Sequence, residues 1–348
     1  MSGYLTDQAF IPAHHQPAVL IDLIHDQGIE LNRLLRHTGL FQEQILSGEA
    51  RLSPHDWLQL IHNARRLFPD PELSFRYGQR LFPGHYGAIS ALLGNAGNLH
   101  EALQVFTGFS KLVFPLLGAH LTITDRHLCL QWLDSCGNGS EHRFVIEAAM
   151  AGLASVTRWL SGERLPWAFQ FRHARPSYPE QYQVHLGDTL YFDGHLDAMI
   201  LPRHYLESPW PGASTIAWRA AKQQCQPQLD PLAGGDSFRL YLYRQLLQNV
   251  ASPPSLQQLA NPLQCSPATL KRRLNSQGCH YQQLLDDARL HQAIHWLQFH
   301  GYSTEQVARQ LNFTDSTNFR RSFKRWSGLT PAACQRALAA TMHSVFPV

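Results

Sequence analysis

The chain has 348 residues, of which 44% are hydrophobic and 16% charged, with a formal net charge of +3. This length is enough for two domains with separate cores, and no apolar run approaches the length that spans a membrane. Residues 1–10 lack the basic and apolar segments of a secretion signal, and the six cysteines have neither CxxC nor zinc spacing. We therefore expect a cytoplasmic protein without a membrane span, a disulfide framework or a metal site.

The first two-thirds of the chain mixes two periodicities. After a tail over 1–16, residues 17–205 form the first expected domain. Helical spacing of the apolar residues predicts amphipathic helices within 17–68, over 101–114 and over 141–160. Alternating residues predict strands, namely a hairpin over 120–133 and short strands at 168–171, 190–192 and 198–201. The first domain is therefore predicted to be α+β.

Two segments of this domain hold candidates for binding a small effector. Such sites are usually apolar pockets with a few polar anchors. The candidates are Phe82, His85, Tyr86, Arg172 and His173. Structural roles are the alternative, because His85 can cap a turn and His173 can end a strand and stack on a neighbour.

Residues 206–237 are predicted to link the first domain to the last third of the chain. The segment is rich in proline and glycine around a short helix-like run over 218–225. We expect it to carry the coupling between the two domains, and its rigidity stays open.

The last third repeats one pattern, at about 255–277 and about 303–327. Each copy opens with a serine that has a glutamine three residues later, Ser255 with Gln258 and Ser303 with Gln306. This is the spacing of a capping box, which begins a helix. Small residues that allow close helix approach follow, and a second helix begins after each turn. The pattern predicts two helix-turn-helix units.

The second helix of each unit is predicted over 267–277 and 316–327. One face carries apolar residues at helical spacing, namely Leu270, Leu274, Phe319, Phe323 and Trp326, and the opposite face is basic. Gly278 and Gly328 suit the left-handed position that ends a helix. A generic helical bundle with solvated basic faces is the alternative, but caps, turns and basic faces repeat together.

Charge is distributed unevenly along the chain. Residues 238–348 hold 12 Lys and Arg against 4 Asp and Glu, a balance of +8, whereas the remaining residues have a balance of −5. A basic domain beside a slightly acidic one is what phosphate binding by one end requires.

Residues from about 238 to 336 resemble the AraC/XylS family of transcription regulators. The motifs that carry the resemblance are Arg289-Leu290-x-x-Ala293-x-x-x-Leu297, similar to the family's linker helix, and Phe313-x-Asp315-x-x-x-Phe319-x-Arg321-x-Phe323-Lys324 with Gly328-x-Thr330-Pro331 and Arg336, similar to its signature. The chain departs from the pattern at Asn312, Cys334 and Pro262, and the proline is expected to shorten the first helix. The resemblance implies an all-α domain over 238–337, with two tandem helix-turn-helix units joined by a long helix, and then a tail over 338–348.

Residues 17–205 resemble the N-terminal domain of one subgroup of this family, which includes regulators linked to ornithine utilisation and quorum sensing. The matching residues are Gly84-His85-Tyr86-Gly87, Asn98-Leu99-x-Glu101-Ala102-Leu103, Phe171-x-His173-x-x-Pro176 and Phe192-Asp193. The resemblance implies a domain that senses an effector or mediates dimerisation, and arabinose is not inferred.

The second helices supply the expected DNA contacts. Residues expected at base edges are Ala268, Lys271, Arg272, Ser316, Thr317, Asn318, Arg320 and Arg321. Residues expected at phosphates are Arg273, Lys324 and Arg325. For Arg321 the resemblance also allows a role in bracing the helices.

We therefore expect a bacterial, sequence-specific regulator of double-stranded promoter DNA, controlled by a small-molecule effector and homodimeric, with RNA polymerase as a candidate partner. The alternatives are an effector-independent regulator whose first domain dimerises or binds a protein, and, more remotely, a fusion with a DNA-repair alkyltransferase. The contexts of Cys225 and Cys334 do not fit that repair chemistry. No HExxH, GxSxG, phosphate-loop or dinucleotide motif is present, so neither an enzyme nor a cofactor is expected. The effector, the promoter and the direction of regulation stay open.

Overall fold

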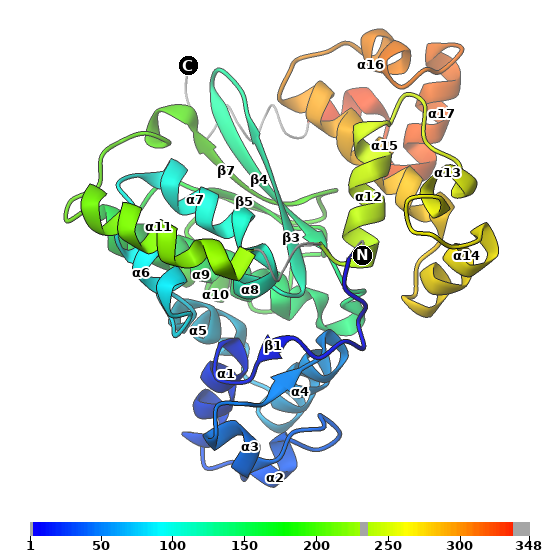
Figure 1. Ribbon diagram of the computed structural model, residues 1–348. Helices are drawn as coiled ribbons and strands as arrows, with labels where there is room; N and C mark the ends of the chain where they lie inside the picture. Colours follow the sequence, from blue (N-terminus) through cyan, green and yellow to red (C-terminus); the bar gives the residue numbers. More distant parts are fainter. Residues whose placement is uncertain (1–2, 230–235, 337–348) are drawn as a thin grey trace. The chain divides into compact units, whose positions relative to one another are not determined.

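The computed structural model describes residues 3–229 and 236–336. These residues form two compact units (Figure 1). The larger unit is built from Tyr4–Thr122 and Leu128–Ser237, and the smaller one contains the residues from Phe238 onward. Within the described ranges, no helix has both the length and the apolar character needed to cross a membrane.

The larger unit combines helices with a mixed sheet. Its helices are α1 (Gln16–His25), α2 (Leu31–Leu34), α3 (Gln42–Leu46), α4 (Pro54–Leu67), α5 (Leu73–Arg80), α6 (Ala88–Gly94), α7 (Leu99–Gly108), α8 (Ser110–Val113), α9 (His142–Ser161), α10 (Pro179–His185) and α11 (Thr215–Leu229). Single 3₁₀ turns lie at Gly139–Glu141 and Arg203–Tyr205. This content confirms the α+β class predicted for the first domain.

The strands form two sheets. They are β1 (Ile11–Pro12), β2 (Arg51–Leu52), β3 (Leu117–Ile123), β4 (His127–Asp134), β5 (Ala168–Gln170), β6 (Leu190–Tyr191) and β7 (Asp197–Pro202). The first two form a small antiparallel pair, and the others form one sheet in the order β3-β4-β7-β5-β6. Strand β5 runs parallel to β6 and antiparallel to β7, so this sheet is mixed. The predicted hairpin and all three predicted short strands are present.

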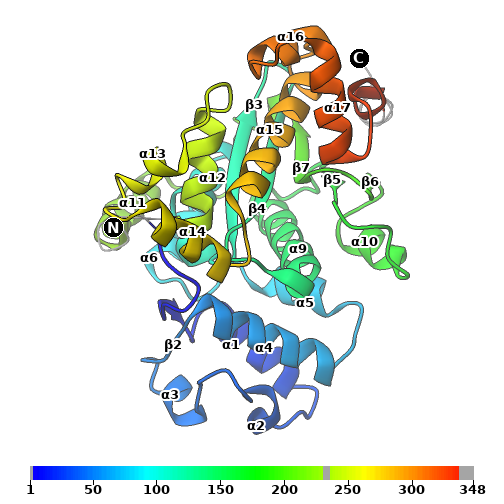
Figure 2. The same ribbon diagram turned by 90° about the vertical axis from the view of Figure 1, so that its right-hand side faces the viewer.

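Helix α9 lies between the sheet and α5 (Figures 1 and 2). Helices α5 and α9 approach closely because each has a glycine at the crossing. A Cβ on Gly78 would lie 2.3 Å from the carbonyl oxygen of Ala148, and one on Gly152 would lie 2.9 Å from that of Gly78. The Ala-rich stripe of α9 and these two glycines therefore set the spacing of the two helices.

The single helix predicted over 101–114 is wrong in its extent, because the chain forms α7 and α8 there. Gly108 is a poor helix former, and the next residue, Phe109, leaves helical geometry with φ −111° and ψ 25°. The phenyl ring of Phe109 is buried. Burial of this side chain accompanies a bend that helical periodicity alone does not reveal.

About half of the segment expected to be a linker forms α11. This helix packs against α6 within the larger unit. Ala221 and Cys225 are buried, and Cys225 is fully inaccessible. The helix-like run predicted over 218–225 is thus longer than expected and contributes to the core.

In the smaller unit, the described residues from Phe238 to Arg336 form helices and connecting turns and no strand. Its helices are α12 (Phe238–Gln248), α13 (Leu256–Ala260), α14 (Pro267–Ser276), α15 (Tyr281–Gln298), α16 (Thr304–Gln310) and α17 (Ser316–Ser327), and a further helix begins at residue 331 and continues to the last described residue, 336. The long α15 packs against α12, α16 and α17. Figure 2 shows it between the α13–α14 pair and the α16–α17 pair. This confirms the predicted pair of helix-turn-helix units joined by a long helix.

Candidate functional site

Both helix-turn-helix units begin with the predicted capping box. The Ser255 hydroxyl accepts the Gln258 N–H at 3.3 Å, and the Gln258 side chain accepts the Ser255 N–H at 2.8 Å. The same two bonds join Ser303 and Gln306, at 3.2 and 2.7 Å. Two otherwise unpaired N–H groups are satisfied at each helix start.

The second helix of each unit has its own cap and a buried side. The Ser266 hydroxyl accepts the Thr269 N–H at 3.1 Å, and Pro267 occupies the first turn of α14, where its missing N–H costs no hydrogen bond. At α17 the cap is Asp315. The residues that anchor the two helices in the core are Leu270, Leu274, Phe319 and Phe323, each at most 1% exposed. Their opposite sides are left to the surface.

The first unit is less regular than the second. Helix α13 has five residues and α16 has seven, as expected from Pro262, which follows α13 closely. In the second unit Asn312 has φ +59°, the left-handed conformation expected where the family has glycine. The glycines Gly278 and Gly328 also have positive φ, as predicted.

The predicted DNA-contacting residues lie on the surface of these two helices. Ser316 is half-buried, and the exposed ones are Ala268, Lys271, Arg272, Arg273, Thr317, Asn318, Arg320, Arg321, Lys324 and Arg325. They form a cationic face on each helix that phosphate and base edges can approach.

Several of these side chains already have partners. Arg320 forms an ion pair with Glu305 of α16 at 2.8 Å, and the Asn318 amide donates to Asp315 at 2.9 Å. Arg325 lies 3.7 Å from Asp286 of α15. Among the described residues Arg321 forms no ion pair, so the bracing contact between α16 and α17 is made by Arg320.

The effector candidates of the larger unit fall into two separate groups. Phe82 and Tyr86 are buried, with ring centroids 5.7 Å apart, and His85 is exposed. Arg172 is exposed, and Nε2 of the half-buried His173 lies 3.2 Å from the Tyr182 hydroxyl. Within the described ranges, no hydrogen bond or ring contact joins the two groups.

The loop before α6 is shaped by a glycine. Gly84 has φ +63°, and a Cβ there would lie 2.3 Å from the Leu81 carbonyl oxygen and 2.4 Å from the Tyr86 ring. The Ser90 hydroxyl accepts the Tyr86 N–H at 2.9 Å and holds the loop against α6. The Phe82 and Tyr86 side chains therefore serve the core of this unit.

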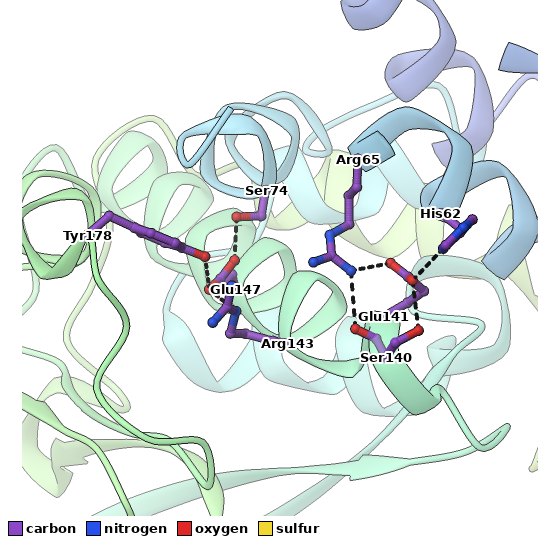
Figure 3. A network of polar contacts seen from close by, with 8 residues as sticks. All are labelled: His62, Arg65, Ser74, Ser140, Glu141, Arg143, Glu147 and Tyr178. Atoms are coloured by element: carbon purple, nitrogen blue, oxygen red, sulfur yellow. Dashed lines mark hydrogen bonds and ion pairs between the residues drawn. The ribbon is translucent and has the colours of Figure 1, made fainter. Parts of the chain in front are cut away.

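A polar hollow of about 190 Å³ lies elsewhere in the larger unit, between α4, α5 and α9. Its charged and polar lining consists of Arg65, Asp70, Ser74, Arg143, Glu147 and Tyr178. Figure 3 shows most of these side chains, which come from segments far apart in the sequence. Reasoning from the sequence missed this site. The sequence does contain one sign of the site, because Glu147 is an acidic residue among the alanines of the helix predicted over 141–160.

Glu147 is the buried centre of this hollow. Its carboxylate accepts the Ser74 hydroxyl at 2.6 Å and the Tyr182 hydroxyl, and the Tyr178 hydroxyl lies 3.4 Å away. Burial and the charge of Glu147 raise the pKa of Tyr178 to about 12, so this phenol stays a donor. Because Tyr182 also contacts His173, one predicted effector residue is connected to the hollow.

A second carboxylate fixes one wall. Glu141 accepts the Arg65 guanidinium at 2.5 Å and lies 3.1 Å from Nδ1 of His62 (Figure 3). Burial acts to raise the pKa of Glu141, but the hydrogen bonds from Arg65 and His62 outweigh it and hold the pKa below its ordinary value. Among the described residues, no group of His, Cys, Asp and Glu is arranged to hold a metal ion.

Comparisons with known proteins agree with this architecture. Residues 28–210 match the family model described as the arabinose-binding domain of AraC transcription regulator, N-terminal, and residues 259–337 match a helix-turn-helix domain. The first match alone covers more than half of the chain.

Relatives from Pseudomonas aeruginosa resemble the chain over most of its length. The ornithine utilization regulator is 30% identical over 319 residues, which cover 91% of this chain and 94% of the relative. The HTH-type transcriptional regulator VqsM is 35% identical over 254 residues, covering 70% and 77%. A solved structure of the transcriptional regulator CdpR from the same organism covers 92% of this chain and 98% of its own, with 21% identity and a TM-score of 0.42.

The matched family models span both units, and the first relative aligns across both. The subgroup resemblance found in the first domain is thereby confirmed, and the smaller unit is a DNA-binding domain. The chain belongs to the AraC family of transcription regulators, with an N-terminal domain of the ligand-binding type, and is not an enzyme.

Proposed function

We propose that this protein recognises a specific promoter sequence by placing α14 and α17 in successive stretches of the major groove, under the control of a small molecule bound by the larger unit. The observation that carries the proposal is the pair of capped helices, each with a buried apolar side and an exposed cationic face. Two such helices about one DNA turn, roughly 34 Å, apart would read two adjacent segments.

Within this proposal the charged residues divide into two roles. Arg272 and Arg321 are exposed and make no ion pair in the part of the chain that the structure describes. Their guanidinium groups are available for bidentate contacts with guanine. Arg320, held by Glu305, positions α17 against α16 as well. Arg273, Lys324 and Arg325 contact phosphates in this assignment.

The larger unit supplies regulation in this proposal. The domain family that matches this unit is of the type that binds effectors and mediates dimerisation. This supports a homodimer that acts on a tandem or inverted operator. RNA polymerase is the further partner of a promoter-bound regulator, and the cytoplasm is where such a protein meets the chromosome. The name of one relative refers to ornithine utilization, which makes amino acids the first effectors to test.

Substitution of the proposed base-reading arginines tests the DNA assignment. A site is first selected from a random DNA pool by the full-length protein. Arg272→Ala and Arg321→Ala should each weaken binding to that site by about 1–3 kcal/mol and relax base choice locally. Arg325→Ala should weaken selected and random DNA by the same factor, because phosphate contacts carry no sequence information. Equal losses on both DNAs for Arg272→Ala would contradict base reading.

A further inference from the structure

We propose that the hollow between α4, α5 and α9 is the effector site and that it takes a zwitterionic α-amino acid. This inference rests on the proposed control by a small molecule and names its site and chemical class.

The size of the hollow limits the ligand. Its volume is about 190 Å³. An engineered protein cavity of about 150 Å³ binds benzene, so this space suits a molecule of up to about ten non-hydrogen atoms. Amino acids of the size of ornithine, glutamate and leucine fall within this limit, whereas the aromatic amino acids exceed it. Long-chain fatty acids, acyl-lactones and disaccharides exceed it and would extend out of the hollow, which is partly open to solvent.

Two arginines can receive a carboxylate. The Arg65 and Arg143 side chains are 36% and 37% exposed and line the hollow from α4 and α9. Arg65 uses one terminal nitrogen for Glu141 and the Ser140 carbonyl, and its other N–H groups make no hydrogen bond within the described ranges. The Arg143 guanidinium lies over the Tyr178 ring, 5.2 Å from its centroid. Planar guanidinium groups with free N–H donors are suited to carboxylates.

Glu147 can receive the ammonium group. Its bond from Ser74 is short, at 2.6 Å, but Tyr178 at 3.4 Å and Arg143 at 3.5 Å lie beyond ordinary hydrogen-bond distances. Two of its four partners are therefore close and neutral, and its one cationic partner, Arg143, is distant for a buried carboxylate. A ligand ammonium can replace those two long contacts while the contacts with Ser74 and Tyr182 remain.

The charge balance of the walls favours a zwitterion over an ion of one sign. Arg65, Arg143, Asp70 and Glu147 all line the same space, and Arg143 and Glu147 are neighbours on α9, 3.5 Å apart. Asp70 is also near Arg76, at 3.5 Å. The two charged groups of a zwitterion can add a contact to wall charges of both signs, whereas a molecule with only a carboxylate or only an amine leaves the charges of one sign with only the partners that they have within the protein.

Thermal melting and calorimetry of the full-length protein test the proposal with matched probes. The amino acids are L-ornithine, L-glutamate and L-leucine. Putrescine keeps both amino groups of ornithine without its carboxylate, and pentanoate keeps a carboxylate without the amino groups. Decanoate and an acyl-homoserine lactone represent larger effectors. At least one amino acid should raise the melting temperature by mass action, and putrescine and pentanoate should not.

Three substitutions locate the binding. Arg143→Gln and Glu147→Gln should each raise the Kd of the amino acid by about tenfold or more, the loss of one charged contact. The control is Arg158→Gln, on the same helix but exposed and outside the hollow, which should leave the Kd unchanged. If Glu147→Gln does not fold, Arg143→Gln carries the test, because that side chain is partly exposed.

Other outcomes overturn the inference in distinguishable ways. An unchanged Kd in Arg143→Gln would place the amino acid elsewhere. A shift with decanoate or the lactone alone would refute the amino-acid class while leaving effector control intact. No shift with any probe, in a protein that still binds its selected DNA site, would refute both the assignment of the hollow as an effector site and effector control. It would favour a regulator whose larger unit only dimerises or binds a protein.

Discussion

At the scale of single residues, Glu141 joins parts of the chain that are far apart in sequence. Its carboxylate accepts Arg65 at 2.5 Å and contacts His62 at 3.1 Å, both from α4. These contacts hold its pKa below the ordinary value despite burial. A carboxylate with a lowered folded pKa contributes stability above its unfolded pKa, about 4.3, and loses it as the pH falls through the folded pKa.

Glu141→Gln should therefore lower the free energy of unfolding by about 1.5–3 kcal/mol near pH 7, the value of a hydrogen bond to a charged group. The difference from the native protein should shrink towards zero at a second, acidic pH below the lowered folded pKa, where the native carboxyl is protonated. Urea denaturation at the two pH values measures it. Glu163→Gln, at an exposed position, is the control. A difference that does not change with pH would refute the ionic explanation.

At the scale of elements, the crossing of α5 and α9 depends on two small residues. Gly78→Ala places a methyl group 2.3 Å from the Ala148 carbonyl oxygen, so the helices must separate. Overpacking of this kind costs about 1–3 kcal/mol of folding free energy. Because Ser74 and Glu147 lie on these two helices, the shift should also weaken their 2.6 Å hydrogen bond.

The matched control is Gly108→Ala in α7, where a Cβ would have no neighbour within 4 Å. There the alanine should be neutral or stabilise the protein by up to about 1 kcal/mol through its better helix propensity. Thermal melting of the two variants measures the contrast. Equal effects of the two substitutions would contradict the close-packing account.

At the scale of the whole molecule, the charges are separated along the chain. Residues 238–348 have a formal net charge of +8, and the remaining residues have a formal net charge of −5. DNA affinity should therefore fall steeply with salt, since each neutralised phosphate adds about 0.9 to the slope of log affinity against log salt. Three phosphate-contacting residues predict a slope of about −2.7 or steeper.

Fluorescence anisotropy with the selected DNA site, between about 50 and 200 mM salt, measures this slope. Lys324→Ala should make it shallower by about 1 and leave sequence preference unchanged. Arg158→Gln removes one positive charge from the larger unit and should not alter it. A slope unaffected by Lys324→Ala would remove that residue from the phosphate contacts.

The sequence by itself determined the elements whose signals are local. The capping boxes at Ser255 and Ser303 and the apolar pair Phe319 and Phe323 lie within a few residues of what they specify, so their helices were predictable. The hairpin and short strands of the larger unit followed from alternation in the same way. Asn312 was also predictable, because few residues other than glycine accept its left-handed conformation.

Only the tertiary structure decided what depends on distant segments. The strand order, the bend at Phe109 and the packing of α11 on α6 result from burial against neighbours that periodicity does not identify. The hollow is the clearest case, since Ser74 and Glu147 are 73 residues apart and meet because Gly78 and Gly152 let their helices approach. Local pattern specifies each helix, whereas close packing between helices decides which polar side chains share a site.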